Sequence, residues 1–328
     1  MAVFRILSLD GGGLLGAFSA AVLASLEKQT GRNIVEHFDL ITGTSTGGLI
    51  AIGLGMGASA QQVLDFYRKD GAKIFPKTGR VGGWVRTLGN IFSAKFQPGP
   101  LRQAVGEVVS EQPLRQARTR LAIPSYQAVP GRVYIFKTPH NAKGRGIQDA
   151  DIPAIDVALA TSAAPTYFPA HRVEQGGILK GVFIDGGVWA NCPAMVGIVE
   201  AIAFCGQRLE DLDMLSISTT NFPFAIGHQA KGWGYWGWAP KIIETFMFGQ
   251  IQAAVAEAGS LLGKDRFLRI DFDTVPHAYT IDDPSGVEEL ISLGIAEAEK
   301  IGNRRPILER FLNGLTIERF TECTAQTG

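Results

Sequence analysis

Two short apolar runs near the start of the chain each stop at a turn of small residues, and a helix-like segment follows each turn. The first run, Phe4 to Leu9, ends in Asp-Gly-Gly-Gly, and the second, Phe38 to Thr42, ends in Gly-Thr-Ser-Thr-Gly. Leu14 to Lys28 has apolar residues at helical spacing, and Gly48 to Met56 is apolar on every side. This alternation predicts an α/β fold with a mainly parallel central sheet and helices on both faces.

The rest of the chain continues in the same style, and apolar, strand-like runs follow at 121–127, 132–137, 178–184 and 211–219. A helix with a regular apolar face begins near Pro284. No linker divides the sequence, so we expect residues 1–328 to form a single domain. The stretch at about 68–102 differs, because eight basic residues accompany one acid and glycines and prolines interrupt it. We expect a basic surface excursion there.

Composition excludes several classes of protein. The 31 basic and 31 acidic residues cancel, so the chain lacks the net positive charge typical of DNA-binding or RNA-binding proteins. Cys192, Cys205 and Cys323 form no Cys-x-x-Cys pair, which argues against a disulfide framework and a zinc site. We expect no metal and no cofactor. The sequence shows no signal peptide and no apolar run of about 18 residues, so we expect a cytoplasmic protein.

The second turn, Gly43-Thr44-Ser45-Thr46-Gly47, has the pattern Gly-x-Ser-x-Gly between a strand and a helix. That context is typical of a nucleophile on a sharp turn, where flanking glycines leave room that side chains would fill. The serine then lies at a helix N-terminus, where the dipole favours developing negative charge. Ser45 is therefore a candidate nucleophile, and a small-residue loop without chemistry is the alternative.

The first turn, residues 11–16, reads Gly-Gly-Gly-Leu-Leu-Gly and fits Gly-x-Gly-x-x-Gly. Such a loop could hold the pyrophosphate of a dinucleotide, or its bare N–H groups could form an oxyanion hole. A dinucleotide site requires an acidic residue where the next strand ends, about 20 residues on. Here that strand ends in Thr42-Gly43, and Asp39 lies at its start. A glycine turn that only packs closely is a third interpretation.

Asp185 ends the apolar run VFI and begins Asp-Gly-Gly. An aspartate at the end of a strand lies at the edge of the sheet where α/β active sites form, although an ordinary Asp-Gly turn looks the same. The Ser…Asp…His order of common α/β-hydrolases allows only His228 or His277 as a base, and neither belongs to a recognisable motif. A Ser–Asp dyad is chemically sufficient when the carboxylate is within hydrogen-bond reach of the hydroxyl.

The sequence resembles the patatin-like phospholipase family over residues 4–195. The resemblance is carried by four blocks in order: DGGGLLG at 10–16, GTSTGG at 43–48, ATSAAPTYFP at 160–169, and DGG at 185–187 with ANCP at 190–193. It weakens after about Thr220. It implies a patatin-like fold in which Ser45 is the nucleophile and Asp185 the base. Backbone N–H groups of Gly11, Gly12 and Gly13 would form the oxyanion hole. Leu15 departs from the family, which often has Arg or Lys there.

The resemblance also implies a function. It implies a serine lipid acyl hydrolase of the phospholipase A type, which cleaves membrane glycerolipids through an acyl-serine intermediate without a cofactor. We expect the protein to contact the membrane peripherally and to form a homo-oligomer. Some bacterial members serve in antiviral defence, where a cyclic nucleotide switches on lipid degradation, so a cyclic nucleotide is a candidate activator. A non-catalytic or storage protein on the same fold is one alternative, and a dinucleotide-binding oxidoreductase is another.

Aromatic residues are frequent in the segment from Lys231 to Trp238, which contains Trp233, Trp236 and Trp238. Tryptophans suit a membrane interface or the entrance for a lipid tail, so these three are candidates for lipid access. Core residues beneath a loop are the alternative. The basic stretch at 68–102 could bind anionic lipid headgroups or form a solvated loop.

Overall fold

The computed structural model describes residues 3–76, 95–109, 111–140, 147–220, 238, 242–275, 278–303 and 309–312. The strands are β1 (Phe4–Leu9), β2 (Leu40–Gly43), β3 (Arg120–Gln127), β4 (Arg132–Lys137), β5 (His171–Gln175), β6 (Ile178–Asp185), β7 (Leu212–Ile217) and β8 (Phe267–Ile270). They form one sheet in the order β5-β6-β3-β2-β1-β7-β8, and β4 also pairs with β3.

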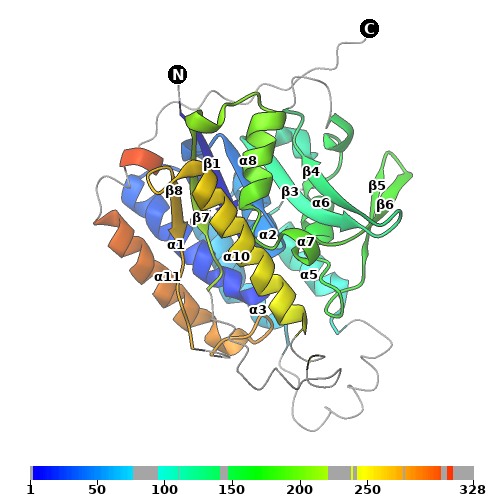
Figure 1. The fold of residues 1–328 in the computed structure, drawn as a ribbon. Helices are drawn as coiled ribbons and strands as arrows, with labels where there is room; N and C mark the ends of the chain where they lie inside the picture. Colours follow the sequence, from blue (N-terminus) through cyan, green and yellow to red (C-terminus); the bar gives the residue numbers. More distant parts are fainter. Residues whose placement is uncertain are drawn as a thin grey trace.

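Helices cover both faces of this sheet (Figure 1). One face carries α8 (Ala194–Ala203) and α10 (Ile242–Leu262). The other carries α1 (Gly16–Thr30), α2 (Thr46–Gly55), α3 (Ala60–Ile74), α5 (Pro98–Gly106), α6 (Ala154–Thr161) and α11 (Val287–Gly302). Alternation along β1 explains the two cores, because Ile6 packs in the first and Leu7 in the second. The predicted α/β fold with helices on both faces is confirmed.

The centre of the sheet is parallel, as the sequence predicts. Strands β3, β2, β1, β7 and β8 all pair in parallel. Every residue of β1, β2 and β7 is buried, which explains their nearly continuous apolar sequences. Parallel neighbours bring their carboxyl ends to one edge of the sheet. The turns after β1 and β2 therefore lie side by side at that edge.

The edge formed by β4, β5 and β6 is antiparallel, so the sheet as a whole is mixed. A tight hairpin causes this reversal at β5–β6. Gln175 pairs with Ile178 across Gly176 and Gly177, whose φ values of 59° and 79° suit a two-residue hairpin turn. Strand β6 then runs back along β3 and ends at Asp185, opposite Ser125.

The chain beyond residue 220 contributes to the same layers. Strand β8 extends the parallel sheet, and α11 packs along α1, where Gly294 allows a close approach. A Cβ on Gly294 would lie only 2.5 Å from the carbonyl oxygen of Phe18. Within the basic stretch, α3 continues to Ile74 and α5 begins at Pro98, while residues 77–94 lie outside the described residues. None of the described helices is long and apolar enough to cross a membrane.

Candidate active site

Ser45 lies on the sharp turn between β2 and α2. Its φ of 55° and ψ of −121° are rarely adopted by a residue with a side chain, and such strain is typical of functional positions. The two flanking glycines are required sterically. A Cβ on Gly43 would lie 2.2 Å from the Gly47 oxygen, and one on Gly47 would lie 2.3 Å from the Leu9 oxygen. Close backbone packing therefore explains the Gly-x-Ser-x-Gly pattern.

Thr161, at the end of α6, supports this turn from the side. Its hydroxyl accepts a hydrogen bond from the Ser45 N–H at 3.1 Å and donates one to the Pro124 oxygen at 2.6 Å. Thr44 adds a second link, because its hydroxyl donates to the Ala190 oxygen at 2.6 Å. The sequence contains Thr161 in a family-like block, but its role as a support for Ser45 was not apparent from the sequence.

Asp185 lies beside Ser45 at the end of β6. The Ser45 hydroxyl donates a hydrogen bond to its carboxylate, and the Gly187 N–H donates another to Oδ1 at 2.7 Å. Only 5% of Asp185 is exposed. Burial raises the pKa of Asp185 to about 6, because it disfavours the charged form more than the two hydrogen bonds favour it. The carboxylate can therefore act as a base near neutral pH.

The glycine loop (residues 11–13) follows β1 and lies against the same serine. A Cβ on Gly11 would lie 3.3 Å from the Ser45 Cβ. The Gly11 N–H, however, already donates to the Asn191 oxygen at 2.9 Å. Gly12 and Gly13 are half-exposed, and no described residue accepts a hydrogen bond from their N–H groups. Of the three predicted oxyanion donors, only these two amides are open in the described part of the chain.

Hydrogen bonds hold the glycine loop from both sides. The Gly11 oxygen accepts from the Thr219 hydroxyl at 2.9 Å and from Asn191 Nδ2 at 3.3 Å. The Leu14 N–H donates to the Ile281 oxygen at 2.9 Å. Asn191 therefore bonds both backbone groups of Gly11, through its own carbonyl and its side chain. Its part in the site was not apparent from the ANCP block.

Gly12→Val is expected to lower the hydrolysis rate by about 10²-fold or more, the scale of losing one oxyanion donor. A Cβ on Gly12 would lie 2.3 Å from the Thr219 hydroxyl oxygen, so the loop or Thr219 must move. Gly99→Val is the matched control, because an added Cβ there meets nothing within 4 Å. The measurement is kcat on a soluble ester. Equal kcat values for Gly12→Val and wild type would exclude the loop as the oxyanion site.

The described histidines do not reach the dyad. Both ring nitrogens of His140 are occupied, by Thr138 and Glu200 at 2.6 and 3.0 Å, and His171 Nε2 lies 3.1 Å from Asp156. His37 is fully buried, and burial lowers its pKa to about 4. His228 and His277 lie outside the described residues. Among the residues that the structure describes, no cluster of His, Cys, Asp or Glu is suited to a metal.

Of the three predicted lipid-access residues, the structure describes only Trp238. Trp238 is half-buried in a helical position, while Trp233 and Trp236 lie outside the described residues.

The dinucleotide alternative receives no structural support. Asp39 lies at the amino end of β2, where its carboxylate accepts the Arg5 N–H at 2.8 Å, on the edge of the sheet opposite to the glycine loop.

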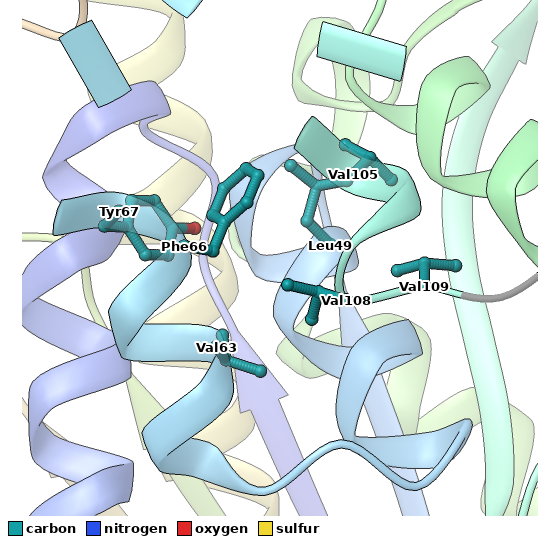
Figure 2. Close-up of a pocket in the computed structure, with 7 residues that line it drawn as sticks. All are labelled: Leu49, Val63, Phe66, Tyr67, Val105, Val108 and Val109. Atoms are coloured by element: carbon teal, nitrogen blue, oxygen red, sulfur yellow. The ribbon is translucent and has the colours of Figure 1, made fainter. Parts of the chain in front are cut away.

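A small apolar hollow lies between α2, α3 and the end of α5. Figure 2 shows the lining side chains, which are Leu49, Val63, Phe66, Tyr67, Val105, Val108 and Val109. Leu49 lies one turn along α2 from Ser45 and donates its N–H to the Ser45 oxygen at 3.0 Å. The Tyr67 hydroxyl is bonded to Thr46. The hollow contains neither Ser45 nor Asp185, and its lining is typical of core packing.

The chain is similar to several known proteins. A family model described as patatin-like phospholipase matches residues 7–198. A relative from Vibrio cholerae, named cGAMP-activated phospholipase, is 32% identical over 98% of this chain and 95% of its own length. A Pseudomonas aeruginosa protein of the same name is 35% identical, with 71% and 68% covered. The solved structure of VipD from Legionella pneumophila is 12% identical, covers 93% of this chain and 67% of that chain, and has a TM-score of 0.48.

The chain belongs to the patatin-like phospholipase family, because the family model matches more than half of it. The sequence-based assignments of family, fold and enzyme class are thereby confirmed. The structure places Ser45, Asp185 and the glycine loop together, although they come from three separate parts of the chain.

Proposed function

We propose that the protein is a phospholipase of the A type, which removes an acyl chain from membrane glycerolipids. The proposal is supported above all by one observation: the Ser45 hydroxyl donates a hydrogen bond to the buried carboxylate of Asp185. The open N–H groups of Gly12 and Gly13 lie in the loop that contacts Ser45. Nucleophile, base and oxyanion donors thus have separate candidates within one site.

The chemistry follows from these positions. Ser45 Oγ attacks the ester carbonyl carbon while its proton passes to Asp185, and the resulting oxyanion accepts hydrogen bonds from Gly12 and Gly13. The ester C–O bond then breaks, and Asp185 returns the proton to the oxygen of the departing lysolipid. Water attacks the acyl-serine and gives a proton to Asp185. That proton returns to Ser45 as the fatty acid leaves.

We also propose that cGAMP activates the enzyme. The support is similarity, because relatives from two bacteria with 32% and 35% identity are named cGAMP-activated phospholipase. Antiviral defence is the biological setting that the resemblance implies. A lipid substrate implies peripheral contact with a membrane. Action as a homo-oligomer stays a prediction.

Fatty acid release from phospholipid vesicles tests both proposals. We expect release in the presence of cGAMP and little release without it, while cyclic AMP serves as the nucleotide control. Release that is equal under all three conditions would contradict activation by cGAMP and leave the phospholipase proposal standing. No release of fatty acid under any condition, from protein that reacts with a fluorophosphonate, would contradict phospholipids as the substrate.

A further inference from the structure

Arg269, on β8, forms a buried ion pair with the residue that precedes the glycine loop. Its Nη1 and Nη2 donate to Asp10 Oδ1 and Oδ2 at 3.0 and 2.6 Å. The side chains are nearly inaccessible, with 9% of Arg269 and 2% of Asp10 exposed. A bidentate pair of this kind fixes orientation as well as distance, because the planar guanidinium matches both carboxylate oxygens.

The guanidinium is itself held on several sides. Nη1 also donates to the Ser216 hydroxyl at 2.7 Å, and Nε donates to Asp271 Oδ2 at 3.1 Å. The Cys192 thiol adds a hydrogen bond to the Asp10 carboxylate. Burial raises the pKa of Asp10, and Arg269 is the principal group that opposes this effect. Without Arg269, the buried carboxylate would lose its cation and two hydrogen bonds.

Asp10 is well placed to fix the glycine loop. Its N–H donates to the Ile217 oxygen at 3.1 Å, and the next residue, Gly11, is bonded to Asn191 and Thr219. Residues 11–13 have no side chains, so side-chain packing cannot hold them. Asp10 supplies the nearest side chain on the N-terminal side. An oxyanion hole loses much of its effect when its donors shift by about 1 Å.

We propose that Arg269 is a positioning residue for the oxyanion hole, acting through Asp10 on the glycine loop. The inference rests on the proposed function of that loop. Arg269 lies outside residues 7–198, which the family model matches. The C-terminal part of the chain therefore contributes directly to the geometry of the reaction site, through a strand that pairs with β7 beside β1.

The test compares Arg269→Met with a second bidentate ion pair at the other end of the sheet. Arg310 donates from Nε and Nη2 to the Asp213 carboxylate at 2.8 and 2.6 Å. Only 3% of the Asp213 side chain is exposed, although Arg310 is more exposed than Arg269, at 39%. Arg269→Met is expected to lower kcat on a short soluble ester by about 10²-fold while KM changes little. Arg310→Met is expected to lower Tm and leave the kcat of folded protein unchanged.

A second variant and a chemical probe make the outcome decisive. Arg269→Lys keeps the charge but not the two-pronged geometry, so its kcat is expected to fall between those of wild type and Arg269→Met. Fluorophosphonate labelling of Ser45 is expected to slow in the same order. Folded Arg269→Met with wild-type kcat would overturn the proposal. If Arg269→Met does not fold, wild-type kcat in Arg269→Lys would overturn it. Wild type that, with cGAMP present, neither hydrolyses esters nor reacts with the probe would contradict the proposed function instead.

Discussion

Ser45→Ala is expected to abolish fatty acid release and fluorophosphonate labelling, with a loss in kcat on the order of 10⁶, the scale seen when the serine of a serine hydrolase is removed. The physical reason is that the acyl-serine intermediate requires the Ser45 hydroxyl, and the site offers no second nucleophile beside Asp185 among the described residues. The fold should survive, because the hydrogen bond to Thr161 comes from the Ser45 backbone N–H.

Ser162→Ala is the matched control for this change. Ser162 directly follows Thr161 in the sequence. It is buried, and its hydroxyl has no hydrogen-bond partner in the described structure. We expect near-normal activity from this variant. Circular dichroism and Tm should match wild type for both proteins. Substantial hydrolysis by folded Ser45→Ala would show that another group attacks the ester.

The parts of the site that could be predicted from the sequence are those determined by local sterics. Gly43 and Gly47 are required because backbone atoms occupy the space of a side chain: atoms four and five residues away for Gly43, and atoms at the end of β1 for Gly47. A turn of that kind requires a recognisable pattern of five consecutive residues, and the apolar runs beside it identify the strand and the helix. Ser45 could therefore be placed at the carboxyl end of a central strand before any contact was known.

The direction of β6 could not be predicted from the sequence. Asp185 was expected at the end of a strand in a mainly parallel sheet, but β6 runs antiparallel to β3. It still reaches the edge with Ser45, because its last residue pairs with Ser125, beyond Ala122, which pairs with Thr42 of β2. Residue patterns do not encode such offsets between strands. They depend on the hairpin at Gly176-Gly177 and on pairing with a strand about 60 residues earlier in the chain.

The different hydrogen bonding of the three glycines in the loop could not be predicted from the sequence either. The three glycines look equivalent in the sequence, yet the Gly11 amide is bonded to a residue 180 positions away and the Gly12 and Gly13 amides are open to the described surroundings. The partner of Asp10 lies still further along, at Arg269, where the family resemblance has faded. Contacts over such separations are selected by packing, and a single sequence contains no periodic signal for them.

Asp185→Asn is expected to lower kcat by about 10⁴-fold or more, because an amide keeps the shape of the carboxylate but cannot take the serine proton. Its effect on Tm should be small. Burial already disfavours the charged form of Asp185, and the amide oxygen can still accept the Gly187 N–H. Asp39→Asn, at the opposite edge of the sheet, is the matched control and should retain its activity.

The pH profile of wild type provides an independent test of Asp185 as the base. Its pKa is raised to about 6 by burial, and only the ionised form accepts a proton. The value of kcat/KM should therefore be level above this pH and fall about tenfold per pH unit below it, since that ratio reports groups in the free enzyme. A histidine base would give a similar limb, so mutation must separate the two. His228→Ala and His277→Ala should each keep most of the activity and the same limb. If either folded variant is as inactive as Asp185→Asn, a triad replaces the dyad.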